Sequence, residues 1–162
     1  QRGIGRGGVF HHVSPLKPIV VSNLSGVYKL AVFPNKSLKQ TVFNILKYVP
    51  ENKIDGGLYY YVLDSDLKQE EIEKVYLDFG VDEEVIKEKG YEDLDLYVLR
   101  NNKWENSGMN YSVKKGEIRY QGYMSAIQGF AVAGIDNDDT MINNSFLYRI
   151  YIIIKELFER FF

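Results

Sequence analysis

The sequence predicts a mostly β protein, an antiparallel β-sandwich-like domain with one short inserted helix and an amphipathic helix at the C-terminus. Residues 74–81 alternate strictly between apolar and other side chains, which is the pattern of a strand with one buried face. Short β-prone runs separated by Gly, Pro and Asn recur along most of the chain. Residues 146–162 instead carry their apolar side chains at helical spacing.

The N-terminal segment, residues 1–22, is predicted to be an extended tail or strand outside the main domain. Residues 1–8 are rich in Gly and Arg without an apolar period, so alone they are expected to be a flexible tail, and a neighbouring chain is the simplest candidate for ordering them. Pro15 and Pro18 lie between the two β-prone runs that follow and favour an edge position in a sheet. We expect this segment to add a strand to the open sheet edge of another copy, through Val9, Phe10, Val13, Ile19, Val20 and Val21.

The β-rich domain is expected to cover residues 23–135. Most of its predicted strands consist of β-branched and aromatic residues, and Gly, Pro or Asn residues mark many of the turns. Asn101 and Asn102 are expected to form a hairpin turn into residues 103–105. The predicted strands are residues 27–33, 39–49, 58–63, 74–81, 93–99, 103–105, 109–113, 117–124 and 129–135.

The inserted helix is expected over residues 83–89. Asp82 supplies the N-cap, acidic residues occupy the first turn, where they favour the helix dipole, and Gly90 ends the helix. These are the start and stop signals of a helix too short to be recognised by its periodicity.

The C-terminal part, residues 136–162, is predicted to be a polar linker followed by the amphipathic helix. The linker offers the oxygen ligands of Asp136, Asp138 and Asp139 to a calcium ion, although it lacks the glycine and distal glutamate of a twelve-residue calcium loop. Calcium is the only cofactor that the sequence suggests. The helix is expected to pack on its own domain, on a partner chain or flat on a membrane, and the residues assigned to assembly are Phe146, Ile150, Ile154, Leu157, Phe158 and Phe161.

Composition excludes several classes of function. The net charge of −2 gives no electrostatic case for a nucleic-acid partner. The absence of cysteine excludes disulfides, thiol catalysis and cysteine-based zinc sites. The longest uncharged run is far shorter than the ~20 residues of a bilayer span, so no transmembrane segment is predicted. No serine lies in a nucleophile-elbow pattern and the acidic residues fall at turns and helix starts, so the chain is not expected to be an enzyme.

Four N-x-Ser sequons begin at Asn23, Asn35, Asn110 and Asn143. Ser and Thr are scarce, so the eleven Asn residues are expected to give about one sequon by chance. The excess favours N-glycosylation and an extracellular location. The alternative is that Asn and Ser simply cluster in turns.

The order of elements over residues 57–134 resembles the archaeal PGF-pre-PGF domain. Residues 72–81 match the family's I-x-F-x-V strand, residues 94–100 its V-x-L-Y-R strand, and residues 101–105 its G-x-W hairpin. Residues 126–134 lie where the family has A-x-x-P-G-F-S-x-F-A-I-x-G, but Gln128-Gly129-Phe130 lacks the proline and the serine. The resemblance implies a β-rich fold and a role in the archaeal cell envelope, in surface-layer-related secreted proteins. It carries no catalytic residues.

Together these observations predict an extracellular structural protein, a subunit or module of a filament, sheath or surface layer. Its expected partners are other copies of itself, joined by strand addition and helix packing, with envelope glycans or related surface proteins as further candidates. The alternative is a cell-surface module that binds a ligand or glycan through the tyrosine-rich strand Tyr59, Tyr60 and Tyr61. Solvent exposure of these tyrosines would favour that alternative, and their burial would count against it.

Overall fold

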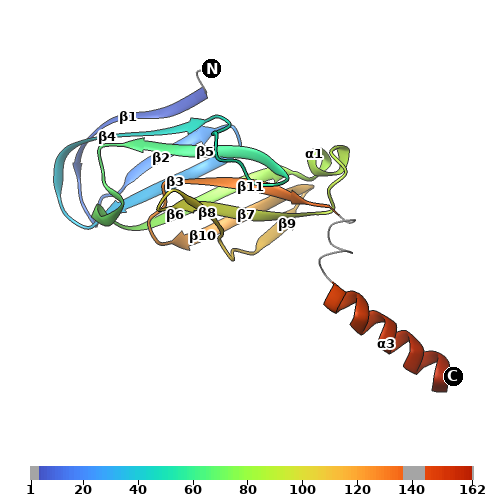
Figure 1. Cartoon of the computed structure of the whole chain (residues 1–162). Coiled ribbons are helices and arrows are strands. Elements are labelled where there is room, and N and C mark those ends of the chain that lie inside the picture. The colour runs from blue at the N-terminus through green and yellow to red at the C-terminus, as the bar shows by residue number, and fades with distance from the viewer. Residues whose placement is uncertain (1–3, 137–144, 162) are drawn as a thin grey trace.

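The computed structural model describes residues 4–136 and 145–161, and its helix α3 stands apart from two β-sheets that lie face to face (Figure 1). Both sheets are antiparallel throughout, so the predicted mostly β, sandwich-like fold is confirmed. The elements are β1 Ile4–Val13, β2 Ile19–Leu24, β3 Val27–Pro34, β4 Leu38–Lys47, β5 Gly57–Ser65, the 3₁₀-helix η1 Gln69–Glu71, β6 Ile72–Asp82, α1 Glu83–Glu88, β7 Asp93–Arg100, β8 Lys103–Asn106, β9 Tyr111–Lys114, β10 Glu117–Met124, β11 Gly129–Ile135 and α3 Ser145–Phe161.

The chain alternates between the sheets as it proceeds. One sheet has six strands in the order β1-β4-β5-β11-β7-β8, and the other has five in the order β2-β3-β6-β10-β9. The turn between β1 and β2 carries the chain from the edge of the first sheet to the edge of the second, and backbone hydrogen bonds between Ser14 and Lys17 close that turn. Both sheets therefore begin with an edge strand taken from the N-terminal segment.

The core between the sheets is apolar and aromatic. Val75, Leu77 and Phe79 of β6 are buried, as the strict alternation of residues 74–81 predicts. The ring of Tyr61 stacks on that of Phe130 with centroids 4.7 Å apart, and both rings meet the ring of Phe79 edge-on. These aromatic contacts join the six-stranded sheet to the five-stranded one, and burial of this surface stabilises the fold.

The local signals for the inserted helix and the hairpins are confirmed. The Asp82 carboxylate accepts a hydrogen bond from the Glu84 backbone amide at the start of α1, and Gly90 follows the helix with φ +80°. Asn101 and Asn102 form the turn between β7 and β8 with φ of +50° and +60°, values that Asn tolerates better than most residues.

The N-terminal segment differs from the expectation of a tail held by another chain. β1 pairs with β4 of the same chain from Ile4 to Val13, and β2 pairs with β3. No domain boundary therefore falls between residues 22 and 23, which both belong to β2. Glycine makes the β1 pairing possible, because a Cβ atom on Gly7 would lie 2.1 Å from the carbonyl oxygen of Phe43. The Gly-rich composition that suggested flexibility instead permits close contact between two strands.

Candidate interaction surfaces

The N-terminal residues assigned to assembly divide between the core and the surface. Val13, Ile19 and Val21 are buried in the core of their own chain, so their assignment as contacts to another copy is wrong for this fold. Their side chains point between the sheets because β1 and β2 are integral strands of the sandwich. Val9 and Val20 are exposed, and Phe10 packs partly against the core.

The backbone edges of β1 and β2 remain open to strand addition. Each of these strands is the outermost strand of its sheet, β1 in the six-stranded sheet and β2 in the five-stranded one. An edge strand presents N–H and C=O groups that can pair with a further strand. The predicted mode of contact therefore keeps a structural basis, but with β1 or β2 as the edge that accepts a strand rather than as a free donor.

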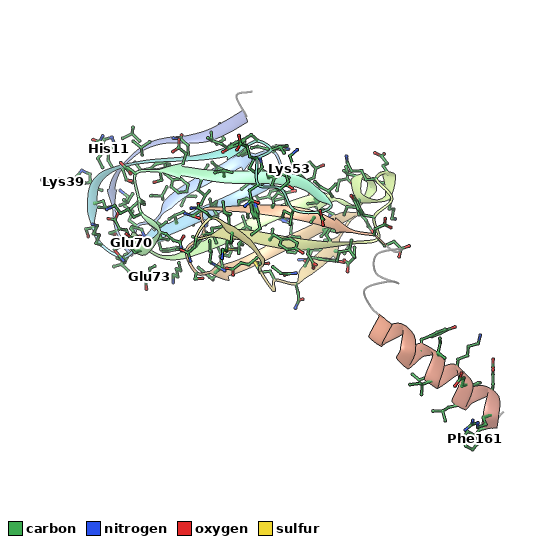
Figure 2. The ribbon with its side chains drawn as sticks, in the orientation of Figure 1. His11, Lys39, Lys53, Glu70, Glu73 and Phe161 are labelled. Carbon is green, nitrogen blue, oxygen red and sulfur yellow. The ribbon has the colours of Figure 1, made fainter. Side chains whose placement is uncertain are left out.

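Helix α3 exposes an apolar face. Ile154, Leu157, Phe158 and Phe161 expose 58%, 48%, 65% and 73% of their surface, and Figure 2 shows Phe161 at the end of α3 that points away from the sandwich. The side chains of Phe146 and Ile150 lie outside the described residues. In the parts of the chain that the structure describes, no helix combines the length and apolar character that crossing a membrane requires.

The sequon and calcium predictions are only partly covered by the structure. Asn23, Asn35 and Asn110 are exposed, as glycosylation requires, and Asn143 lies outside the described residues. The Asn35 side-chain amide donates a hydrogen bond to the Glu70 carbonyl at 2.8 Å, a contact that an attached glycan would have to accommodate. Asp136 is exposed just after β11, whereas Asp138 and Asp139 lie outside the described residues. Within residues 4–136 and 145–161, no three His, Cys, Asp or Glu side chains come together as metal ligands.

The tyrosine-rich strand does not form an exposed binding surface. Tyr60 and Tyr61 expose only 4% and 1% of their surface, and Tyr59 is half-buried. The Tyr61 hydroxyl donates to the carbonyl of Ser25, and burial raises the pKa of that hydroxyl. The Tyr60 hydroxyl accepts from the Ile54 amide at 2.9 Å. These partners are structural, so the burial counts against the glycan-binding alternative as it was assigned to this strand.

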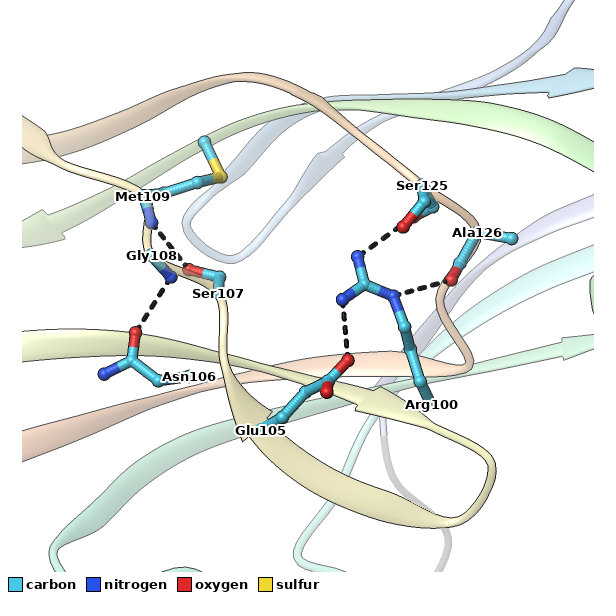
Figure 3. Close-up of polar contacts among 8 residues, drawn as sticks. All are labelled: Arg100, Glu105, Asn106, Ser107, Gly108, Met109, Ser125 and Ala126. Carbon is cyan, nitrogen blue, oxygen red and sulfur yellow. Dashed lines mark hydrogen bonds and ion pairs between the residues drawn. The ribbon is translucent and has the colours of Figure 1, made fainter.

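Arg100 is the centre of a polar cluster that holds two loops together. Figure 3 shows its guanidinium donating to the carbonyl of Ala126 at 3.0 Å and pairing with Glu105 at 2.7 Å. A third, longer bond of 3.4 Å reaches the Ser125 carbonyl. The cluster ties the β7–β8 hairpin to the connection between β10 and β11. Its donors are occupied by backbone and carboxylate oxygens, which is the arrangement of a structural clamp rather than of a ligand site.

A second polar cluster joins the two sheets near α1. The Tyr111 hydroxyl donates to Asp93, and this bond, followed by burial, raises the pKa of Tyr111 to about 12. Burial, and then the charge of Asp93, raises the pKa of Asp95, while a hydrogen bond with Asn106 opposes that shift. The cluster connects β7 of one sheet with β9 of the other. It brings two carboxylates near a neutral tyrosine, without a histidine or cysteine nucleophile among them.

Sequence reasoning missed an aromatic surface on the outer face of the five-stranded sheet. Phe33, Tyr76 and Tyr123 come from β3, β6 and β10. The ring centroids of Tyr76 and Tyr123 are 5.0 Å apart, and those of Phe33 and Tyr123 are 6.1 Å apart. Tyr123 is 62% exposed. Only the strand register, in which Tyr123 lies directly opposite Tyr76, brings these residues together, and a single sequence does not display that register.

Lysine side chains lie over this aromatic surface. The Lys74 ammonium is 4.9 Å from the ring centroid of Phe33 and 5.0 Å from that of Tyr123. The Lys29 ammonium is 5.7 Å from the ring centroid of Tyr76. Ammonium groups at such distances are attracted by the negative face of an aromatic ring. The surface therefore combines the exposed ring of Tyr123 and the half-buried rings of Phe33 and Tyr76 with ammonium groups on long side chains.

Comparisons with known proteins find no counterpart for this chain: no protein-family model matches it, and neither the curated proteins nor the solved structures give a significant match. The similarity to the PGF-pre-PGF domain thus stays a prediction from the motifs of residues 57–134.

Proposed function

We propose that this chain is a structural module of an extracellular cell-surface assembly, such as a filament, sheath or surface layer, and that α3 joins it to other copies. The observation that carries the proposal is the exposed apolar face of α3 beside a sandwich whose own core is closed. An exposed apolar face of this kind marks an interaction site. The proposal includes no catalytic activity.

The spacing of apolar residues in α3 favours another α3 as the partner. Leu147, Ile150, Ile154, Leu157 and Phe161 follow one another at intervals of three and four residues, the a/d spacing of helices that pack side by side. Additional apolar residues broaden this face beyond a two-helix seam, which suits a bundle of more than two helices.

The charged face of α3 favours a protein partner over an anionic lipid surface. Lys155 and Glu159, and likewise Glu156 and Arg160, are spaced at i and i+4 with opposite signs. A helix that lies on a membrane typically carries an excess of Lys and Arg on its polar face. The mixed charges of α3 instead resemble the solvated outer side of a helical bundle.

Two further features support an extracellular, assembled role. Asn23, Asn35 and Asn110 are all exposed, as glycosylation requires, and the motif order of residues 57–134 resembles that of secreted archaeal envelope proteins. The open edges of β1 and β2 offer a second contact, because strand addition at either edge would extend a sheet from copy to copy.

The test is the oligomeric state of the intact chain beside a variant of α3. We expect residues 1–162 to form oligomers or filaments at tens of micromolar, by light scattering and electron microscopy. Ile154→Asp together with Leu157→Asp should leave a monomer with an unchanged Tm, because both side chains are exposed in the isolated chain. Lys155→Asp, on the polar face, is the matched control and should still assemble.

Two results would refute the proposal. A monomeric intact chain at high concentration, with and without calcium, would remove the assembly role altogether. Persistence of the oligomer in the double variant would move the contact away from α3 and toward the open edges of β1 and β2. Deleting residues 1–22 is not a usable alternative test, because this deletion also removes Val13, Ile19 and Val21 from the core.

A further inference from the structure

The outer face of the five-stranded sheet carries a regular array of side chains. Across β3, β6 and β10, one row contains Ala31, Tyr76 and Tyr123, because Ala31 and Tyr123 both pair with Tyr76. The adjacent rows pair Lys29 with Asp78 and Phe33 with Lys74. Tyr76 thus lies at the centre of the array, with Tyr123 beside it in the same row. Lys29 lies in one adjacent row, and Phe33 and Lys74 lie in the other.

The array is a preformed shallow site. A depression of about 320 Å³ lies over it, lined by Pro18, Lys29, Ala31, Phe33, Tyr76, Asp78 and Tyr123. Its ring-bearing residues stand on paired strands rather than on loops, so they are held in place before a ligand arrives. The Asp78 carboxylate is fixed by a two-bond contact with the Arg119 guanidinium, at 2.8 and 3.0 Å.

The array presents the positive charges of Lys29 and Lys74 to a ligand. Among the described residues, neither Lys29 nor Lys74 forms an ion pair with a carboxylate, and both ammonium groups rest over aromatic rings instead. The one acidic group in the depression, Asp78, is already neutralised by Arg119. An incoming carboxylate is a stronger partner for an ammonium group than a ring face is.

We propose that this face binds a saccharide chain that carries carboxylate groups, such as a chain of uronic acids. The C–H groups on one side of a sugar ring pack against the electron-rich face of Tyr123. Lys74 leaves the rings of Phe33 and Tyr123 and pairs with a sugar carboxylate, and Lys29 binds a second carboxylate on the other side of Tyr76. The site lies on the sandwich and does not depend on assembly through α3.

Two other classes of partner fit the surface less well. A nucleic acid stacks its bases on aromatic side chains but also requires a continuous basic groove that follows its phosphates, whereas among the described residues only the ammonium groups of Lys29 and Lys74 lie over these three rings. A protein interface is typically depleted of lysine in its core, whereas here Lys74 lies over two of the three rings. Aromatic rings held on paired strands, with ammonium groups on flexible side chains beside them, instead suit a saccharide chain that carries negative charge.

The experiment titrates the unglycosylated chain of residues 1–162 with tetragalacturonate, and with a neutral 1,4-linked galactose tetramer as the comparison. Calorimetry measures the affinity, and amide chemical shifts map the site. We expect saturable binding of the acidic tetramer, a loss of at least tenfold for Tyr123→Ala, and a loss of several-fold with weaker salt dependence for Lys74→Gln. Tyr48→Ala, an exposed tyrosine outside the array, is the control and should bind normally.

Several results would overturn the inference. Absence of saturable binding by the folded wild-type chain at millimolar tetragalacturonate would remove the site. Equal binding by Tyr123→Ala would show that the rings do not contact the sugar. Equal affinity for the neutral tetramer would remove the role of the lysines, and equal affinity for hexaglutamate would show that the face recognises acidic peptides rather than sugar rings.

Discussion

Tyr61 provides the most direct test of the internal structure, because the fold places it in the core whereas the glycan-binding alternative requires it at the surface. Its ring is 1% exposed and lies between Phe130 and Phe79, with centroids 4.7 and 5.4 Å away. Its hydroxyl bonds the carbonyl of Ser25 in the β2–β3 turn. One side chain thus links both sheets.

Two substitutions separate the hydrogen bond from the ring. Tyr61→Phe removes the bond to the Ser25 carbonyl and keeps the packing, so it should destabilise by about 1 kcal/mol. Tyr61→Ala also opens a cavity between the sheets and should destabilise by about 3–5 kcal/mol, as truncation of other buried aromatic residues does. For a domain of this size these losses correspond to decreases in Tm of about 4 °C and about 12–20 °C.

Thermal unfolding followed by circular dichroism measures both effects. Tyr59→Ala is the matched control, because Tyr59 is a half-buried tyrosine on the same strand. The Lys47 ammonium lies 4.7 Å from the centroid of its ring. Substitution of Tyr59 should lower the Tm far less than Tyr61→Ala. If Tyr61→Ala lowered the Tm no more than Tyr59→Ala does, Tyr61 would not be a core residue. The tyrosine-rich strand would then again become the leading candidate for a binding surface.

Two further predictions follow from local contacts. Asp95→Asn should raise the Tm near neutral pH, because burial and the charge of Asp93 raise the folded-state pKa of Asp95 above its unfolded value and so disfavour the folded carboxylate. The difference in Tm between Asp95→Asn and the wild type should shrink as the pH falls through that pKa, because the wild-type carboxyl then takes up a proton. A Tm difference that stays the same between pH 3 and 8 would contradict this. Gly7→Ala should lower the Tm and speed amide exchange along β1, because its Cβ would lie 2.1 Å from the Phe43 carbonyl oxygen; Arg6→Ala is the exposed control, and equal effects of the two changes would refute the close approach.

Local patterns predicted most of the fold correctly. The alternation of residues 74–81 reports one buried face, and β6 buries Val75, Leu77 and Phe79 as that pattern requires. The Asp82 cap and the Asn101-Asn102 turn are likewise set by residues next to each other in the chain. These signals succeed because the contacts that they describe span only a few residues.

The N-terminal segment was mispredicted because its structure depends on a distant partner. Residues 4–8 have no apolar period, and their order comes from backbone pairing with residues 43–47 of β4. Glycine in a sequence is compatible with a flexible tail and also with the close approach of two strands. Composition cannot distinguish the two, and only the partner strand settles which one applies.

The tyrosine-rich strand does not form the aromatic surface that its sequence suggests. Tyr59, Tyr60 and Tyr61 are adjacent in sequence, but neighbouring side chains on a strand point to opposite faces, so three in a row cannot form one surface. Tyr61 faces the core, and on the other side Tyr60 packs edge-on against Trp104 with centroids 5.8 Å apart.

The rings that do share one outer face are separated by more than forty residues at each step, from Phe33 to Tyr76 and from Tyr76 to Tyr123. Their alignment depends on the register of β6 against β3 and β10, and this includes irregularities beside Val27 and Pro34 in β3. A shift of one residue in either pairing would turn the rings of that strand to the other face. The surface is therefore a property of the folded sheet, and it exists only if the same register that buries Leu77 and Phe79 is formed.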